Sequence, residues 1–281
     1  MAEYANPNVL VSTDWVAQHL DDPNVKLVEV DVDTEAYDQG HIKGAVAWNW
    51  TTQLNENVQR DILSQANFEK LLSESGVKAE DTLILYGDNN NWFAAFAFWQ
   101  AKLNGHKDVR LMNGGRKKWI EVENRETTTD KPSVAATSYK VSQRDEAAVR
   151  SLQPDVRKFM DQKAGSLVDV RSPAEFTGEI IAPPGLLETA QRGGHIPGAA
   201  NIPWSKAVND DGTFKSADEL AALYGGAGVT KDKPTIAYCR IGERSSHTWF
   251  VLKYLLGYPE VRNYDGSWTE WGSMVGQPIE K

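Results

Sequence analysis

The chain has 281 residues, 41% hydrophobic and 25% charged, and its 39 acidic and 30 basic side chains give a net charge of −9. This composition is typical of a globular protein about two domains long, and the negative balance argues against nucleic-acid and anionic-membrane partners. The single cysteine excludes an internal disulfide and a thiolate-rich metal site, and it fits a reducing compartment. Residues 1–7 show no signal-peptide pattern, and no apolar run approaches the ~20 residues of a membrane span, so we expect a cytoplasmic protein.

The first half of the chain alternates helical and strand-like patterns. A helix is expected over residues 13–20, followed by an apolar strand at 27–31. Two further strands, at 82–86 and 109–112, flank an aromatic-rich helix at 93–103. Strands that alternate with helices favour an α/β fold with a mostly parallel sheet and helices on both faces.

The second half repeats the first. The pattern Gly-His-Ile-x-Gly-Ala occurs at 40–45 and again at 194–199, and from residues 84 and 236 onward the halves align without a gap at an offset of 152. A repeat of this length indicates two homologous domains rather than a solenoid. We predict domains over 1–124 and 138–281, joined by a Thr-, Ser- and Pro-containing linker at 125–137.

The chemistry of the second copy is concentrated after its strand at 235–238. Cys239 ends this strand, a loop with two arginines and a glycine runs to Arg244, and a helix is expected over 248–256. Such a loop directs backbone N–H groups and the positive end of a helix dipole at one point, so we expect the Cys239 thiol to ionise early. A lone cysteine can also be a small buried hydrophobe. The arginine neighbours argue against that alternative.

The first copy lacks this chemistry. The offset of 152 places Gly87 opposite Cys239, Asp88 opposite Arg240 and Trp92 opposite Arg244. We therefore expect one active site per chain, with the first copy forming one wall of a cleft.

The sequence resembles the rhodanese family, specifically its two-domain thiosulfate sulfurtransferases. The resemblance covers the whole chain and is carried by the duplicated Gly-His-Ile-x-Gly-Ala, the Asp169-Val170-Arg171 triplet, the loop 239–244 and the Asp265-Gly266-x-Trp268 turn. It implies two rhodanese-like α/β domains with the active site at their interface. It also implies a reaction in which the loop cysteine takes the outer sulfur of thiosulfate, releases sulfite and holds a persulfide until cyanide or a thiol acceptor removes the sulfur.

The resemblance assigns roles by position. Cys239 matches the persulfide cysteine, and Arg171, Arg240 and Arg244 match positions that bind the anionic substrate. Forked guanidinium donors suit a sulfonate-like dianion, which supports this assignment independently. A cysteine that is already ionised needs no separate base, and neither a metal nor an organic cofactor is implied.

The remaining candidates for substrate contact lie in the loop and in the first domain. Ile241, Gly242 and Glu243 complete the loop, and Trp92 and Phe93 lie in the segment that gives relatives an aromatic wall, with core packing as the alternative. We expect Glu243 to point outward or to pair with an arginine rather than to act in catalysis.

Other polar residues have expected structural roles. His41, His195 and His247 are expected to fix backbone or packing. Asp169 and Glu175 are expected to orient Arg171 or to cap local structure.

Three alternative functions remain open. A cysteine phosphatase would carry five residues between cysteine and arginine, whereas this loop carries four. A 3-mercaptopyruvate sulfurtransferase is similar in architecture, but its loop is typically uncharged after the cysteine. A non-catalytic rhodanese module that binds a partner or carries sulfur is the third alternative. The oligomeric state is not indicated by the sequence.

Overall fold

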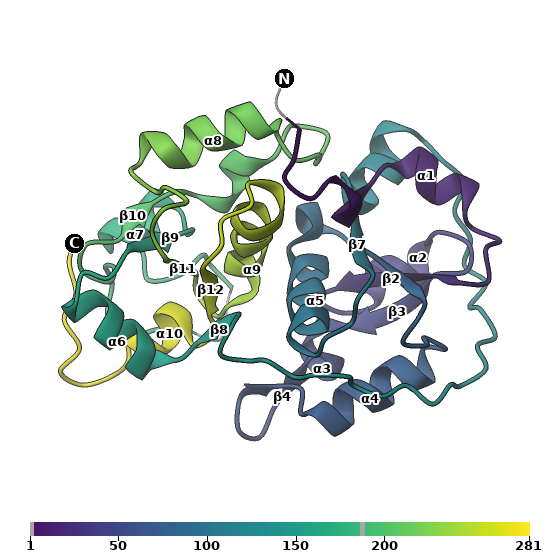
Figure 1. Cartoon of the computed structure of the whole chain (residues 1–281), viewed down its shortest axis with the longest axis horizontal. Helices are drawn as coiled ribbons and strands as arrows, with labels where there is room; N and C mark the ends of the chain where they lie inside the picture. Colours follow the sequence, from purple (N-terminus) through teal and green to yellow (C-terminus); the bar gives the residue numbers. More distant parts are fainter. Residues whose placement is uncertain (1–2, 186–188) are drawn as a thin grey trace. The chain divides into compact units, whose positions relative to one another are not determined.

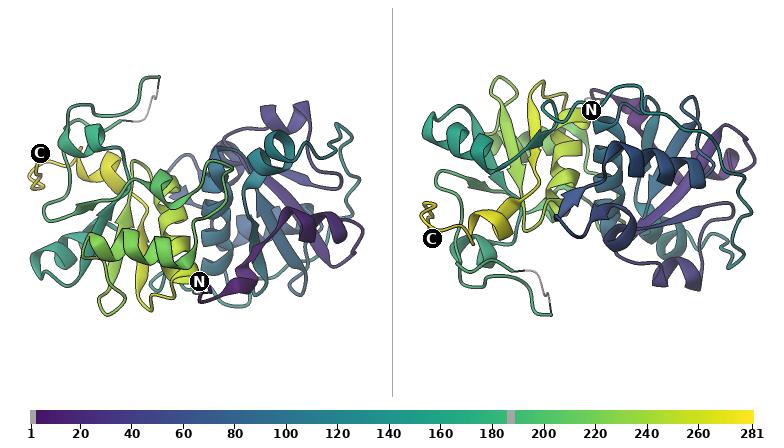
Figure 2. Two further views of the ribbon diagram at one scale, coloured as in Figure 1. Left: turned by 90° about the horizontal axis from the view of Figure 1, so that it is seen from above. Right: turned by 90° about the horizontal axis from the view of Figure 1, so that it is seen from below.

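The computed structural model describes residues 3–185 and 189–281, and it forms two compact units (Figure 1). We call them the N-unit (Asn8–Asp145 and Asn209–Phe214) and the C-unit (Met1–Pro7, Glu146–Val208 and Lys215–Lys281). Each contains a five-stranded, fully parallel sheet with helices around it, which confirms the predicted α/β architecture (Figure 2). No helix in the described part of the chain is both long and apolar enough to cross a membrane.

The sheet of the N-unit has the strand order β1-β7-β6-β2-β3. Its strands are β1 (Leu10–Val11), β2 (Val25–Asp31), β3 (Val46–Asn49), β6 (Thr82–Tyr86) and β7 (Val109–Met112). A separate antiparallel pair is formed by β4 (Asn55–Glu56) and β5 (Asp61–Ile62). The helices are α1 (Thr13–Gln18), α2 (Glu35–Gln39), α3 (Trp50–Gln53), α4 (Gln65–Glu74) and α5 (Trp92–Leu103), with shorter turns η1 (Pro7–Val9), η2 (Asn89–Asn91) and the π-helical η3 (Lys117–Val122).

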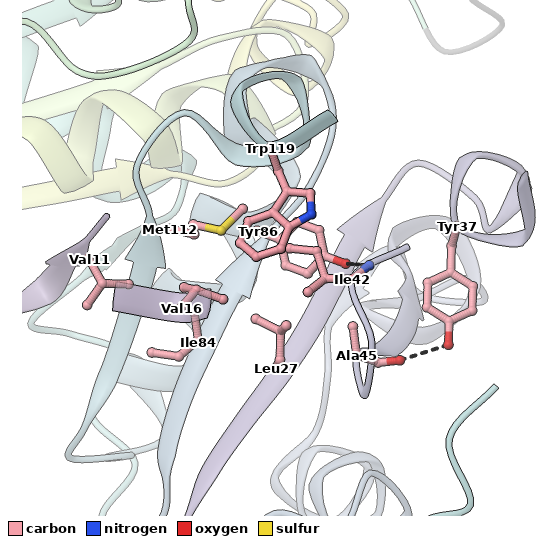
Figure 3. Close-up of a cluster of buried hydrophobic side chains, with 10 residues drawn as sticks. All are labelled: Val11, Val16, Leu27, Tyr37, Ile42, Ala45, Ile84, Tyr86, Met112 and Trp119. Carbon is pink, nitrogen blue, oxygen red and sulfur yellow. Dashed lines mark hydrogen bonds between the residues drawn. The ribbon is translucent and has the colours of Figure 1, made fainter. Parts of the chain in front are cut away.

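One core cluster of the N-unit gathers side chains from its sheet and from the segments packed on it (Figure 3). The Tyr86 hydroxyl accepts a hydrogen bond from the Ile42 backbone N–H at 3.1 Å, and the Tyr37 hydroxyl donates to the Ala45 carbonyl at 2.8 Å. These bonds fasten the Gly-His-Ile-x-Gly-Ala turn to strand β6 and to helix α2.

The sheet of the C-unit has the equivalent order β10-β9-β11-β12-β8. Its strands are β8 (Arg150–Ser151), β9 (Ser166–Asp169), β10 (Ala200–Asn201), β11 (Thr235–Tyr238) and β12 (Val261–Tyr264). Its helices are α6 (Gln153–Asp161), α7 (Pro173–Thr177), α8 (Ala217–Gly226), α9 (Glu243–Phe250) and α10 (Ser267–Trp271), with the turns η4 (Trp204–Ala207) and the π-helical η5 (Val251–Leu255).

The duplication extends to individual hydrogen bonds. The Ile196 N–H donates to the Tyr238 hydroxyl at 3.1 Å, as Ile42 does to Tyr86. The Trp271 indole donates to the Pro278 carbonyl, and the Trp119 indole donates to the Glu126 carbonyl. The two halves therefore repeat their packing as well as their sequence.

The segment at 125–137, predicted as a linker, contains no helix or strand but is attached to the N-unit. Thr128 forms an antiparallel bridge with His41, and the Thr137 N–H donates to the Ser73 carbonyl at 2.9 Å. In the C-unit, Glu280 forms the corresponding bridge with His195. A terminal segment thus closes over the histidine turn in both copies.

Candidate active site

The loop after β11 is shorter than the sequence suggests, because α9 begins at Glu243 rather than near residue 248. Gly242 ends the loop with a left-handed backbone (φ 96°), and a Cβ there would lie 2.9 Å from the Asp265 carbonyl oxygen, so this position requires glycine. The Ser245 hydroxyl, at 3.2 Å, and the Asn263 amide, at 2.9 Å, both donate to the Gly242 carbonyl. The expected position of the helix start was therefore wrong by about a turn.

The sulfur of Cys239 lies inside this loop with no exposed surface. The Gly242 N–H donates to Sγ at 3.1 Å, and the thiol in turn donates to Glu243 Oε2 at 3.4 Å. The Cys239 N–H donates to the Ser267 hydroxyl at 3.0 Å, which ties the loop to α10. The sulfur is thus buried among polar groups, with a backbone amide directed at it as the sequence predicts.

The surroundings of Cys239 in the structure do not favour early ionisation of its thiol. Burial raises the pKa of the thiol, and the nearby Glu243 carboxylate raises it further, while Arg244 and hydrogen bonds to Ser245 lower it by less. The expectation from the sequence was wrong because it counted the arginines and amides but neither the desolvation nor the acidic neighbour. These surroundings of Cys239 thus favour the protonated thiol over the thiolate.

Arg171 is completely buried and already paired. Its Nε and Nη2 donate to the two carboxylate oxygens of Asp169 at 3.0 and 2.6 Å, and Nη2 also donates to the Gly194 carbonyl at 2.7 Å. The guanidinium lies over the Trp268 ring, 4.7 Å from its centroid. Asp169 orients Arg171 as expected, and Nη1 is the donor without a partner among the described residues.

Arg244, in the first turn of α9, is paired as well. Its Nη1 and Nη2 donate to the two carboxylate oxygens of Glu175 at 3.2 and 3.1 Å. Glu175 also accepts from the Ser172 N–H at 3.0 Å, in a capping box that opens α7. Glu175 therefore caps local structure as expected, but its arginine partner is Arg244 and not Arg171.

Glu243 is buried rather than pointing outward. Its Oε1 lies 3.9 Å from Arg240 Nη2 and 3.8 Å from Arg244 Nε, so of the two expected arrangements the structure shows the pairing with an arginine. Ile241, between these charges, is buried. Each of the three predicted anion-binding arginines thus faces a carboxylate in the C-unit.

The histidines have the structural surroundings that the sequence predicts. The His41 ring stacks on Tyr37 and the His195 ring on Phe176, and in each the Nδ1 lies 2.9 Å from the carbonyl oxygen of its stacking partner. His247 is packed edge-on against Trp204, and burial lowers the pKa of His247 to about 3, which keeps the ring neutral.

In the N-unit, backbone atoms fill the space inside the loop that corresponds to the cysteine loop. A Cβ at Gly87 would lie 2.1 Å from the Val30 carbonyl oxygen, so no side chain fits there. Asn91 fastens this loop by accepting from the Gly87 N–H at 3.0 Å and donating to the Met112 carbonyl at 2.7 Å.

Trp92 and Phe93 begin helix α5 of the N-unit. Phe93 is buried and packs against the rings of Trp50 and Trp92, with centroids 5.2 and 5.3 Å away. Core packing therefore accounts for Phe93, and contact of either residue with substrate stays a prediction.

Two features of the site were missed by sequence reasoning. The pattern Ser-Pro-x-Glu at 172–175 predicts the cap that Glu175 forms, but nothing in the sequence connects Glu175 with Arg244. The anchoring by Ser267 likewise depends on the fold alone. Within residues 3–185 and 189–281, no group of three or more His, Cys, Asp or Glu side chains is arranged to hold a metal ion.

Comparison with known proteins gives matches over both units. The rhodanese-like domain pattern matches residues 12–122 and 152–274. The sulfur carrier protein TtuD of Thermus thermophilus is 57% identical over 282 residues, covering 99% of this chain and 98% of its own. A Haloferax volcanii protein with the provisional name thiosulfate sulfurtransferase is also 57% identical, over 285 residues, covering 100% of this chain and 98% of its own.

Among solved structures, YnjE matches with a TM-score of 0.87 at 24% identity, over 100% of this chain and 70% of its own. A complex of an EanB variant with hercynine matches with the same TM-score and identity, over 100% of this chain and 71% of its own. At this level of identity the likeness concerns the fold.

Proposed function

Because the chain belongs to the two-domain rhodanese family, we propose that it is a thiosulfate sulfurtransferase in which Cys239 carries the transferred sulfur. The observation that supports this most directly is the Gly242 N–H directed at Sγ, 3.1 Å away, at the start of a helix that also carries Arg244. Backbone amides and a helix N-terminus stabilise negative charge on sulfur, both on a thiolate and on the terminal atom of a persulfide.

The proposed first half-reaction transfers one sulfur atom to the enzyme. The Cys239 sulfur, as a thiolate, attacks the outer sulfur of thiosulfate; a new S–S bond forms, the bond to the sulfonate sulfur breaks, and sulfite leaves with the electron pair. In the second half-reaction an acceptor, cyanide or a thiolate, attacks the terminal persulfide sulfur, and the Cys239 thiolate is regenerated. Because Sγ has no exposed surface, groups around it must move to admit the substrate.

Thiosulfate is favoured over 3-mercaptopyruvate as the donor for two reasons. The loop carries Arg240 and Arg244, which suit a dianion. In addition, relatives at 56–58% identity carry the provisional name thiosulfate sulfurtransferase. We expect kcat/KM to be higher for thiosulfate than for 3-mercaptopyruvate, and the reverse order would favour the second donor.

A sulfur carrier is the second candidate, because a relative bears that name and a buried sulfur protects a persulfide from oxidation. Both candidates require the same Cys239 persulfide, and they differ in whether a small acceptor discharges it.

The test combines two measurements on the full chain. Intact mass after thiosulfate treatment should show one added sulfur atom, absent in Cys239→Ala, and thiosulfate:cyanide transfer should show steady turnover. An added sulfur without turnover would favour the carrier, and no added sulfur would contradict both.

A further inference from the structure

Two of the groups hydrogen-bonded to the Cys239 sulfur act in opposite directions. The Gly242 N–H donates to Sγ at 3.1 Å, whereas Glu243 Oε2 accepts the thiol proton at 3.4 Å. The amide stabilises the ionised sulfur, but the carboxylate stabilises the protonated one. The Cys239 thiol and the Glu243 carboxylate are therefore a proton donor and a proton acceptor that share one proton.

The other oxygen of Glu243 is directed at positive charge. Oε1 lies 3.9 Å from Arg240 Nη2 and 3.8 Å from Arg244 Nε, and the side chain is buried. Burying a carboxylate beside a thiol opposes thiolate formation and repels an incoming dianion. The arginines offset part of these costs, but they do not account for the contact between Oε2 and Sγ.

The alternatives to Glu243 as a base are occupied elsewhere in the C-unit. Glu175 is engaged by Arg244 and by the cap of α7. His195 is fixed against Phe176, and His247 is neutral and packed against Trp204. Among the described residues, Glu243 is the carboxylate hydrogen-bonded to the sulfur.

We propose that Glu243 is the proton acceptor for Cys239 and delivers the same proton to the departing sulfite. This inference rests on the proposed thiosulfate reaction and adds a second catalytic residue to it.

The steps balance without any additional reactant. The S–H bond of Cys239 breaks and the proton passes to Glu243 Oε2, which leaves a thiolate and a neutral carboxyl. The thiolate attacks the outer sulfur of thiosulfate, and the bond to the sulfonate sulfur breaks with its electron pair on the leaving group. Glu243 then gives its proton to that group, so the products are the persulfide anion of Cys239, hydrogen sulfite and an ionised Glu243.

The charges around the pair suit this transfer. Arg240 and Arg244 face the Cys239–Glu243 pair from the loop and from α9, and Glu175 of α7 reaches it through Arg244. Asp265, beside Gly242, is paired with Arg150 at 2.7 Å. Moving the proton from sulfur to carboxylate keeps the net charge of this buried group unchanged, whereas losing it to bulk water would add one negative charge beside a dianion.

The test compares the wild type with Glu243→Gln and Glu243→Asp. Gln keeps the size and can still accept from the thiol, but it cannot take up the proton. We expect single-turnover sulfite release at pH 7 to fall about 10²-fold in Glu243→Gln, a loss typical of a missing general acid–base. The loss should shrink as pH rises, because solvent then removes the thiol proton, and Glu243→Asp should recover part of the rate.

A second readout checks that Glu243 acts on the Cys239 thiol, and the rate of sulfite release then separates a proton acceptor from a merely electrostatic neighbour. The pH midpoint of Cys239 alkylation by iodoacetamide should move down in Glu243→Gln, since the acidic neighbour raises the pKa of the thiol. If Glu243 only opposed ionisation, the same variant would release sulfite at an equal or higher rate at pH 7, and that result would overturn the proposal. An unshifted alkylation midpoint would also overturn it.

The outcome for the wild type distinguishes this inference from the proposed function. If the wild type releases sulfite and Glu243→Gln releases it at the same rate, only the role of Glu243 as proton acceptor is ruled out. If the wild type releases no sulfite from thiosulfate, thiosulfate is not the sulfur donor, and the proposed role of Glu243 is ruled out with it.

Discussion

Arg244→Met tests whether the arginines of the loop are held by buried ion pairs. Methionine keeps much of the aliphatic stem but removes the fork that donates to Glu175 at 3.1 and 3.2 Å. Both side chains are nearly inaccessible, at 8% and 1% exposure, so the variant leaves a buried carboxylate without its main counter-charge. Breaking a buried pair from one side typically costs about 3–5 kcal/mol.

The pH dependence of the unfolding free energy shows whether the pair between Glu175 and Arg244 stabilises the folded state. Burial raises the pKa of Glu175, but the hydrogen bonds and charge of Arg244, together with hydrogen bonds from Ser172, outweigh it and leave the pKa below its ordinary value. A lowered carboxyl pKa contributes stability above the unfolded-state pKa, and this contribution is lost as pH falls below about 4. In Arg244→Met this loss of stability at acidic pH should disappear, because protonating Glu175 then removes an unpaired buried charge.

The assay is urea unfolding of the full chain followed by tryptophan fluorescence, with two matched variants. Arg157→Met removes an exposed pair with Asp161 in the same unit and should cost at most about 0.5 kcal/mol. Arg244→Met/Glu175→Gln should recover at least half of the single-variant loss. A loss under about 1 kcal/mol in Arg244→Met, or a double variant no better than the single one, would refute the reasoning. In activity, the same substitution should raise the KM for thiosulfate more than it lowers kcat.

Three further outcomes are expected. Gly242→Ala should lower both stability, by about 1–3 kcal/mol, and sulfur transfer, because its φ of 96° and the Asp265 carbonyl 2.9 Å away disfavour a Cβ; unchanged Tm and turnover would contradict this. Burial and Glu29 raise the pKa of Asp31 to about 7, so its stabilising protonated form is lost as pH rises from about 4 to 7. Asp31→Asn should therefore stabilise the protein more at pH 8 than at pH 5, and parallel thermal-unfolding profiles would be evidence against it. The loop of Cys239 is too short to enclose phosphate, so aryl phosphate turnover should be absent; turnover that Cys239→Ser removes would show the opposite.

The sequence was most informative where apolar runs and repeated glycines set the structure. The strands at Thr82–Tyr86 and Val109–Met112 have the predicted bounds, because each is a short apolar run ended by glycine or polar residues. The duplicated histidine turns were equally predictable, since the same glycines recur at the same spacing.

The start of α9 was not predictable from polarity. Its first turn reads Glu-Arg-Ser-Ser-His, a pattern typical of an exposed loop, yet every residue of α9 is buried. Sequence patterns assume that polar residues face water. In α9 the polar groups face one another and the Gly242 carbonyl instead.

The partners of the arginines were unpredictable for a related reason. Glu175 and Arg244 are 69 residues apart, and only the parallel order of β9 and β11 brings their elements together. The thiol pKa depends on the same long-range placement, since its largest cause is burial.

The tight approach at Gly87 has a consequence for any attempt to give the N-unit a nucleophile of its own. With the Val30 carbonyl oxygen 2.1 Å from where a side chain would start, the backbone of the N-unit occupies the volume that a nucleophile would need. Replacing Gly87 with cysteine would therefore push strands apart before it restored any reactivity. A second reactive centre in this chain therefore requires more than the exchange of one residue.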